Sequence, residues 1–261
     1  MALAVDEGLV VEEVRRELAR RHLFYFMDYC WWMPTPLIRG IHTWAITDRI
    51  TRAVNDLDRG ISTFLLVQVV FRHGKSDIVS RALPAWFLGR RAAMQPNVIM
   101  TGYGADLVES FSAKTKLIIG SERYQEVFPE VTLSRRLNAV GKWAVEGSVG
   151  EVNAVGLGGS ITGKGGDLIE VDDYCKNREE AESQAYRDAT WFSFTNDVLT
   201  RRSNCALVIV CATPWNVDDV AGRIKKAMVN DPDFPQFEVL KFAAEGEQYK
   251  SGYLFPEMYG P

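Results

Sequence analysis

The sequence predicts an α/β protein with a mostly parallel sheet that is covered by helices on both faces. Apolar strand-like runs alternate with helical patterns along the chain, and the run "CALVIVCA" at 205–212 is apolar at every position. A strand without a polar face has both faces buried, as in the middle of a parallel sheet. Strands that alternate with helices favour parallel pairing, because each helix returns the chain to the start of the next strand.

The elements are placed by periodicity and by their turn residues. Residues 9–30 are predicted to form an amphipathic helix. The apolar residues of this stretch, with charged residues between them, are Val10, Val14, Leu18 and Phe26. A second helix is expected over about 41–57. Strands are then expected at 63–70, 97–102, 167–172, 205–212 and 237–242, with helices near 75–90, 105–119, 178–200 and 217–229. The stretch "KWAVEGSVGEVNAVG" predicts a β-hairpin insertion that turns near 147–150.

Length and composition limit the possible classes of protein. The 261 residues suit one large domain or two small ones, and 47% hydrophobic residues predict a real core. With a net charge of −4, any contact with nucleic acid must be a local basic patch. The four cysteines have no C-x-x-C spacing, the N-terminus has no signal peptide, and the aromatic segment 23–32 is too interrupted to span a bilayer. These features predict a protein of the reducing cytosol.

The stretch "FRHGKS" at 71–76 follows an apolar strand and precedes a helix, which is the layout of a phosphate-binding loop. The usual pattern is G-x-x-x-x-G-K-[ST], and Val69 stands where the first glycine belongs. Gly74 would let the backbone approach a phosphate closely. Lys75 would reach the β- and γ-phosphates of ATP, and Ser76 would hold Mg²⁺. The alternative is a chance Gly-Lys-Ser.

The second half of an ATP site would be the strand "DLIEVDD" at 167–173. Asp172 would hold Mg²⁺ and Asp173 would polarise the attacking water; the alternative is a pair of helix-capping residues. Glu170 shares a strand face with Leu168 and Asp172. A carboxylate inside a covered sheet costs several kcal/mol unless it is paired. Glu170 therefore has a basic partner, is protonated, or lines the site.

Weaker signals accompany these two motifs. Thr213, at the tip of the central strand in "CATPWNVDDVAGRI", would lie near the γ-phosphate and sense hydrolysis, although Thr-Pro also makes ordinary turns. His73 is interpreted as a packing or phosphate-adjacent residue rather than a catalytic base. Arg135 and Arg136 would contact DNA or form a solvated basic turn.

Together, these motifs resemble the ATPase domain of the large terminase subunit of tailed bacteriophages. The resemblance runs from about residue 42 to the end, and its stretches are "FRHGKSDIVSRALPAWFLGR", "YGADLVESF", "FPE", "VGLGGSITGKGGDLIEVDDYCKNREEAES", "TRRSNCALVIVCATPWNVDDVAGRI" and "YLFPEMY". It implies a P-loop NTPase fold of the ASCE type that works as a ring on the capsid portal. ATP hydrolysis then drives double-stranded DNA into the prohead.

The resemblance also implies roles for single residues. Lys75 and Ser76 would bind phosphate and Mg²⁺, Asp172 would serve the metal, and Asp173 would be the general base. Arg72 lies inside the loop, where the family commonly has a basic residue that can reach the γ-phosphate.

Two further roles concern coupling and assembly. Thr213 belongs to the family's coupling motif. Lys164 in "GSITGKGGD" is the candidate for a basic group delivered to the site of a neighbouring subunit. The alternatives are a solvated loop lysine at that position, or Arg135 and Arg136 in the same role.

The predicted organisation is an N-terminal helical segment at 1–60, packed on a P-loop ATPase domain at 61–261. The family's C-terminal nuclease domain has no counterpart, so no DNA cleavage is expected. The expected partners are double-stranded DNA, the portal protein and prohead, and the small terminase subunit, in the host cell cytoplasm and without a membrane. A homo-oligomeric ring is expected on assembly, with a monomer possible in isolation. The alternatives are a ring-assembly module that binds nucleotide with weak hydrolysis, or another P-loop translocase or helicase.

Overall fold

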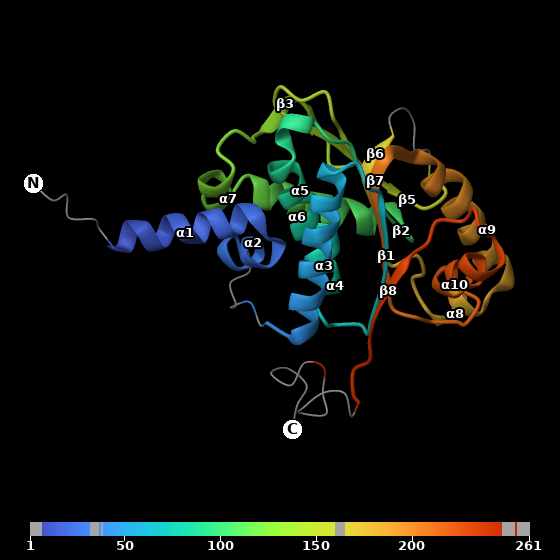
Figure 1. Ribbon diagram of the computed structural model, residues 1–261. Coiled ribbons are helices and arrows are strands. Elements are labelled where there is room, and N and C mark those ends of the chain that lie inside the picture. Colours follow the sequence, from blue (N-terminus) through green and yellow to red (C-terminus); the bar gives the residue numbers. More distant parts are fainter. Residues whose placement is uncertain (1–6, 32–36, 38, 160–164, 247–253, 255–261) are drawn as a thin grey trace, which may run out of the picture.

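The structure, a computed structural model, describes residues 7–31, 37, 39–159, 165–246 and 254. An eight-stranded sheet runs through this part of the chain, in the order β3-β4-β5-β2-β6-β7-β1-β8 (Figure 1). The strands are β1 Thr63–Val69, β2 Val98–Gly102, β3 Leu133–Asn138, β4 Lys142–Val145, β5 Val152–Gly156, β6 Gly166–Asp172, β7 Arg202–Ala212 and β8 Glu238–Phe242. The predicted α/β class is confirmed.

The strands from β5 to β8 in this order pair in parallel, while β3 and β4 are antiparallel to their neighbours. Parallel strands have their carboxyl ends at one edge of the sheet. In the register of β6, β7 and β1, Asp172 lies beside Cys211, and Gln68 lies beside Ala212. The ends of these three strands therefore bring the predicted loop, the acidic pair and Thr213 to one edge.

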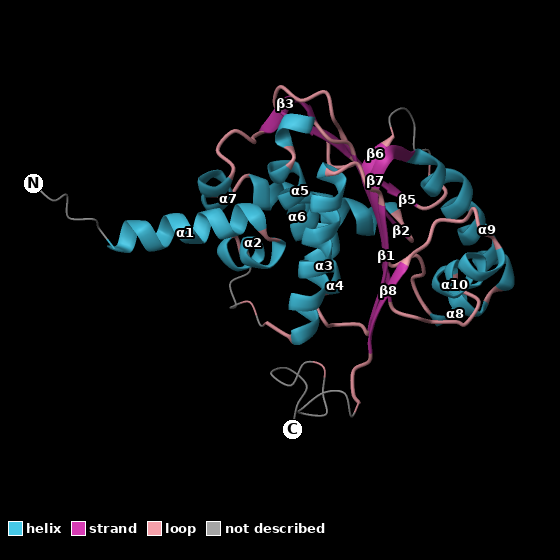
Figure 2. Cartoon of the chain, viewed as in Figure 1, coloured by secondary structure: helices cyan, strands magenta, loops and turns pink. Residues whose placement is uncertain are grey.

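Helices cover both faces of the sheet (Figure 2). On one face lie α3 Ile41–Asp58, α5 Leu83–Arg90 and α6 Ala105–Ile119; on the other lie α8 Arg178–Glu182, α9 Gln184–Ser193 and α10 Val220–Asn230. The central strand β7 explains the continuous apolar run. Ile209 packs in the apolar cluster of the first face, while Val208 and Val210 pack in that of the second.

The N-terminal helical pattern forms two helices rather than one, α1 Glu7–Arg21 and α2 Leu23–Tyr29. His22 separates them, because its extended backbone ends α1 and its ring Nδ1 accepts a hydrogen bond from the N–H of Phe24 at 3.1 Å. Val10, Val14 and Leu18, the apolar positions of the predicted amphipathic helix, are all exposed. The first turns of α1 extend away from the body of the protein, so nothing in the described chain covers them (Figure 1).

The rest of the N-terminal segment shares a core with the sheet. Phe26 of α2 and Ile46 and Ile50 of α3 belong to the same buried apolar cluster as Leu65 and Val67 of β1. Among the helices that the structure describes, none combines the length and apolarity needed to cross a membrane.

The helix expected at 75–90 is divided into α4 Lys75–Asp77, a π-helical turn η1 Ile78–Ala82, and α5. Pro84 explains the wider turn, because it has no N–H to donate to the carbonyl of Ser80 and its ring clashes there. The carbonyl of Ser80 instead accepts a hydrogen bond from the Thr115 hydroxyl at 3.3 Å.

The helix expected at 178–200 is likewise interrupted. Ser183 adopts an extended backbone, which separates α8 from α9, and the chain then continues as π and 3-10 turns. The remaining short helices are η2 Ala92–Met94, α7 Glu122–Val127, η3 Phe194–Val198 and η4 Leu199–Arg201.

The predicted hairpin is present, since β4 and β5 pair antiparallel with Trp143 opposite Val152. It is not an insertion, however, because β5 also pairs in parallel with β2 and so widens the main sheet. A further antiparallel strand, β3, was not predicted and lies at this end of the sheet. Its sequence "LSRRLN" lacks the apolar alternation of a strand, and charged side chains of this kind are typical of a protected edge strand.

Candidate functional site

The loop after β1 contains two residues with a left-handed backbone, Arg72 and Gly74. Val69 ends the strand in register with Phe242, so the position of the missing glycine has ordinary strand geometry. Gly74 has a φ of +72° and caps the start of α4. This left-handed conformation favours glycine, since a Cβ would be strained there. Arg72 also has a positive φ of 63°, and its side chain is exposed.

Lys75 joins the loop to the acidic pair. Its side chain is only 7% exposed, and its ammonium contacts the Asp173 carboxylate and lies 3.6 Å from Oδ1 of Asp172. Burial lowers the pKa of Lys75, but the two carboxylates outweigh burial and raise it above its ordinary value. Lys75 is therefore a charged group held at the end of β6.

Asp172 lies at the end of β6 and is almost completely buried. Its Oδ2 accepts a hydrogen bond from the Ser80 hydroxyl at 2.8 Å, and the Ser76 hydroxyl lies close enough to lower the pKa of the carboxyl group. Burial raises the pKa of Asp172, while Lys75 and the two hydroxyls oppose this shift. Its Oδ1 has no hydrogen-bond donor within the described ranges.

This donor set fits Mg²⁺. The ion commonly takes one or two protein oxygens and completes its shell with water and phosphate oxygens. The buried Oδ1 of Asp172, with the Ser76 hydroxyl beside it, offers such oxygens. No cluster of three or more His, Cys, Asp or Glu suited to a metal occurs in the part of the chain that the structure describes. A site built entirely from protein ligands is thus not seen there.

Asp173 is held by its backbone as well as by the contact of its carboxylate with Lys75. It has a φ of +50°, its N–H donates to the carbonyl of Cys211 at 3.0 Å, and its carbonyl accepts from the N–H of Tyr103 at 2.8 Å. A Cβ on Gly102 would lie 2.5 Å from the Asp172 carbonyl oxygen, so β2 approaches this closely only with glycine there. The Asp173 side chain remains 28% exposed, where a ligand can reach it.

The other residues predicted for the site lie around this centre. The buried His73 ring donates through Nδ1 to the carbonyl of Phe71 at 3.0 Å, and its own carbonyl accepts from Nε2 of His42 at 2.9 Å. These contacts support the interpretation of His73 as a packing residue of the loop. The Thr213 hydroxyl donates to the carbonyl of Val69 at 3.4 Å, which links the end of β7 to the end of β1.

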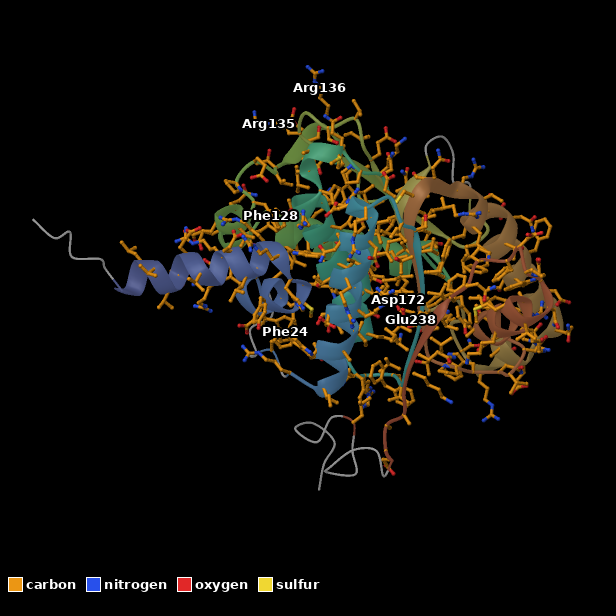
Figure 3. All side chains as sticks on the ribbon, viewed as in Figure 1. Phe24, Phe128, Arg135, Arg136, Asp172 and Glu238 are labelled. Carbon is orange, nitrogen blue, oxygen red and sulfur yellow. The ribbon has the colours of Figure 1, made fainter. Side chains whose placement is uncertain are left out.

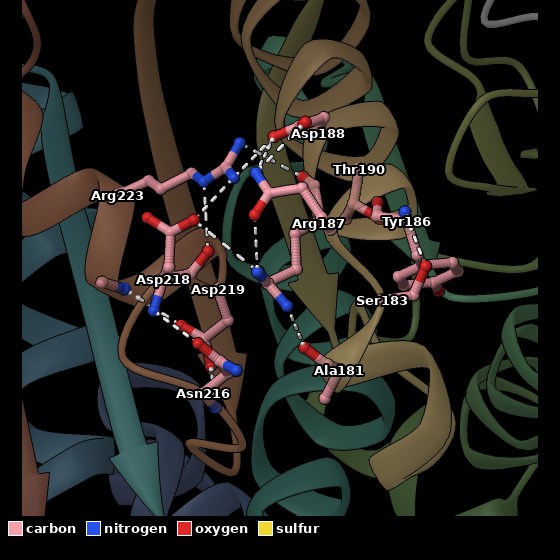
Figure 4. A network of polar contacts seen from close by, with 12 residues as sticks. Ala181, Ser183, Tyr186, Arg187, Asp188, Thr190, Asn216, Asp218, Asp219 and Arg223 are labelled. Atoms are coloured by element: carbon pink, nitrogen blue, oxygen red, sulfur yellow. Dashed lines mark hydrogen bonds and ion pairs between the residues drawn. The ribbon is translucent and has the colours of Figure 1, made fainter.

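Residues 213–219, which begin with Thr213, are here called the coupling loop. Asp219 at its end caps α10, and its carboxylate accepts hydrogen bonds from the N–H groups of Trp215 and Asn216 in the loop and of Gly222 in the helix. Arg223 then donates to Asp218 and Asp188, at 2.7 and 2.6 Å (Figure 4). The loop is thereby tied to α10 and α9.

Glu170 lies inside the sheet, on the same face of β6 as Asp172. It is 1% exposed, its strand neighbours are Met100 and Ile209, and neither carboxyl oxygen has a hydrogen-bond partner among the described residues. Burial, and then the charge of Asp172, raise the pKa of Glu170 well above its ordinary value. Of the three alternatives for Glu170, a basic partner is not found in this part of the chain, and burial favours the protonated form.

Of the candidates for a group acting across an interface, the structure describes Arg135 and Arg136. Lys164 lies outside the described residues. Arg135 and Arg136 are exposed on β3, at the end of the sheet far from Asp172 (Figure 3).

Sequence reasoning missed two contributors, Ser80 and Gly102. The signal for Ser80 was its spacing of four residues from Ser76, which places both hydroxyls on one helix face. Gly102 offered a weaker signal, because a glycine that ends a strand also occurs where no close approach exists.

No protein-family model and no curated protein matches this chain. Among solved structures, the large terminase of bacteriophage HK97 is similar to it. The likeness has a TM-score of 0.56 at 14% sequence identity and covers 93% of this chain. It covers 48% of the HK97 protein, so the chain spans about half the length of that terminase. The chain therefore has a terminase-like α/β fold.

Proposed function

We propose that the chain is the ATP-hydrolysing motor domain of a viral terminase, which translocates double-stranded DNA into a prohead. The observation that carries the proposal is the contact of Lys75 with both Asp172 and Asp173, beside a left-handed Gly74. P-loop ATPases join a phosphate-binding lysine to a metal-binding and a water-activating group at the same edge of the sheet. The terminase-like fold supports the same function.

The residues of the site would divide the work as follows. Lys75 would leave the carboxylates and bind the β- and γ-phosphates of ATP. Ser76 and Asp172 would hold Mg²⁺, which neutralises part of the phosphate charge when it is bound. Release from Lys75 would free Asp173 to accept a proton from the attacking water. The water oxygen then bonds to the γ-phosphorus as the bond to ADP breaks.

Coupling and assembly are further parts of the proposal. Thr213 would sense the γ-phosphate, and its hydrogen bond to the Val69 carbonyl would pass a displacement to the coupling loop. Arg72, exposed in the phosphate loop, would reach the γ-phosphate. A neighbouring subunit in a ring would supply another basic group, for which Lys164 is the candidate. The portal, the prohead and the small terminase subunit would be the partners.

A second candidate function is a module that binds nucleotide and assembles in a ring, with weak hydrolysis. The buried Glu170 without a hydrogen-bond partner in the described chain favours it, because an ionised carboxyl there would disturb the strand that carries Asp172. Phosphate release from Mg-ATP, measured with and without duplex DNA and portal-bearing proheads, separates the two. A motor should turn over ATP faster with DNA and proheads, whereas nucleotide binding without turnover in either condition would contradict the motor.

A further inference from the structure

A surface hollow of about 410 Å³ lies between the coupling loop, α10 and the edge strand β8. The side chains that matter for its chemistry are Gln68, Trp215, Asn216, Lys225 and Lys241. Gln68 is the last residue but one of β1, and its partner in the parallel register is Lys241 of β8. In-register residues of parallel strands point to the same face of a sheet, so both side chains face α10.

The hollow carries uncompensated positive charge. The ammonium of Lys225 donates to Oε1 of Gln68 at 2.6 Å, and neither Lys225 nor Lys241 forms an ion pair with a carboxylate in the described chain. The next residue, Lys226, behaves differently, since it pairs with Asp218 at 2.9 Å. Two ammonium groups beside one neutral amide make a local basic patch in a protein of net charge −4.

One carboxylate, that of Asp219, also lines the hollow. Its oxygens accept three backbone N–H groups, from the coupling loop and from the first turn of α10. Three hydrogen bonds and the start of a helix stabilise its negative charge locally. The Asp219 carboxylate therefore holds the coupling loop and forms no ion pair with Lys225 or Lys241 in the described chain.

We propose that this hollow binds a phosphate group of the DNA backbone. Lysine binds phosphate as a point charge, and amide and indole N–H groups of the kind that Asn216 and Trp215 carry also donate to phosphate oxygens in complexes with DNA. The hollow lies beside an edge strand, so a long polymer can pass along it without threading into the fold. The assignment to DNA rests on the proposed function, whereas the anion chemistry rests on the two lysines.

The position of the hollow connects it to the ATP site. Gln68 stands directly before Val69, whose carbonyl accepts the Thr213 hydroxyl. The coupling loop also lies directly on α10, because a Cβ on Gly222 would come within 2.0 Å of the Val217 carbonyl oxygen. A phosphate that draws Lys225 away from Gln68 would therefore change the contacts of the end of β1 and of the coupling loop at the same time.

The exposed pair Arg135 and Arg136 is the other candidate surface for DNA. It lies on β3, which forms the opposite edge of the eight-stranded sheet from β8. Figure 3 shows both side chains directed away from the body of the protein. A DNA duplex bound there would not touch the coupling loop, so variants can separate the two surfaces.

The test is the binding of a labelled 30-base-pair duplex to the full chain, followed by fluorescence anisotropy over a series of KCl concentrations. The double variant Lys225→Gln/Lys241→Gln should bind less tightly than the wild type. Its plot of log K against log [KCl] should be less steep by about 0.9, the value for the one phosphate contact that is lost. Lys226→Gln is the matched control on the same helix and should leave the slope unchanged.

The other outcomes overturn the proposal. These are a double variant with wild-type affinity and slope, a loss of binding confined to Arg135→Gln/Arg136→Gln, or a wild type that does not bind duplex. Inorganic phosphate at equal ionic strength is the second probe. Phosphate binding that the double variant abolishes, together with unchanged duplex binding in that variant, would show a site for free anions instead.

The DNA site and the ATPase activity can be tested separately. ATP turnover without DNA is measured on the same preparations. Turnover without DNA binding would refute only the DNA site. A wild type without turnover, whose duplex binding weakens in the double variant, would instead leave the DNA site standing and remove the proposed motor activity.

Discussion

Glu170 and Asp172 lie on the same strand and face the same side of the sheet, but their surroundings differ. Asp172 stands at the end of β6, where Ser80 donates to it and Lys75 lies 3.6 Å away. Glu170 stands two residues earlier, between Met100 and Ile209, with no hydrogen-bond partner within the described ranges. Both are buried, and burial raises the pKa of each carboxyl group.

The difference shows that position along a strand decides whether a buried carboxyl group can be used. At the end of β6, the helical turns that follow the loop 70–74 supply the Lys75 ammonium and the Ser80 hydroxyl, which face the carboxylate. In the middle of the strand, the backbone groups of β2 and β7 are used by the sheet, and the neighbouring side chains are apolar. A charge therefore costs less at the strand end than in the middle.

The largest effect should come from Lys75→Ala, which removes the cation at the strand end. We expect ATP turnover to fall by at least about 10²–10³-fold, and nucleotide binding to weaken, because the β- and γ-phosphate charge loses a preorganised partner. Phosphate release and the binding of a fluorescent ATP analogue measure the two effects. Lys142→Ala, which removes an exposed lysine paired with Glu151, is the control. Unchanged turnover in Lys75→Ala would remove the phosphate-loop assignment.

Asp173→Asn keeps the shape of the side chain and removes the base. Turnover should fall by about 10²–10⁴-fold, the usual contribution of a general base, while ATP binding is retained. Titration with the fluorescent analogue and single-turnover hydrolysis separate binding from chemistry. If the variant loses ATP binding while hydrolysis per bound ATP persists, the roles of the two aspartates are wrongly assigned.

Glu170→Ile should stabilise the protein by about 1–3 kcal/mol near pH 8, because it removes an unsatisfied buried carboxyl group. The pKa of Glu170 is raised on folding, so between the unfolded pKa near 4.5 and the folded value the folded state binds more protons. Stability of the wild type then falls as pH rises through this window, and the gain from isoleucine should be larger at pH 8 than at pH 5.

Thermal and urea unfolding at the two pH values measure this effect. Glu170→Gln is the control, because it removes the titration but leaves a buried polar group. It should lose the same pH dependence and gain less stability than Glu170→Ile. A lower melting temperature for Glu170→Ile would mean that Glu170 has a structural partner, and a loss of ATPase activity as well would place Glu170 in the site.

The smallest effect should come from Ser80→Ala, which removes one hydrogen bond from Asp172. A net loss of about 1 kcal/mol is expected, seen as a several-fold higher Mg²⁺ concentration for half-maximal turnover. Ser110→Ala, at an exposed position on α6 where the hydroxyl donates to the Leu107 carbonyl, is the control. Equal Mg²⁺ dependence in both variants would show that Ser80 does not position Asp172.

Local chemistry made much of the site predictable. A glycine followed by Lys75 and Ser76 after an apolar strand, and two aspartates at the end of another, are patterns whose causes lie within a few residues. Ser80 was missed because its spacing from Ser76 is a local signal, whereas its contact with Asp172 joins residues 92 positions apart in the chain. The edge strand β3 was missed because its backbone pairing with β4, rather than an apolar pattern, makes it a strand.

The sequence by itself determined the α/β class, the alternation of strands and helices, and the residues expected at the site, because periodicity and turn chemistry are local properties. Only the tertiary structure decided what each group touches. It brought Lys75 within reach of residues about a hundred positions away, left Glu170 without a hydrogen-bond partner in the described chain, and left the apolar side of α1 exposed. These outcomes depend on the order of strands in the sheet and on the packing of distant elements, which no local pattern encodes.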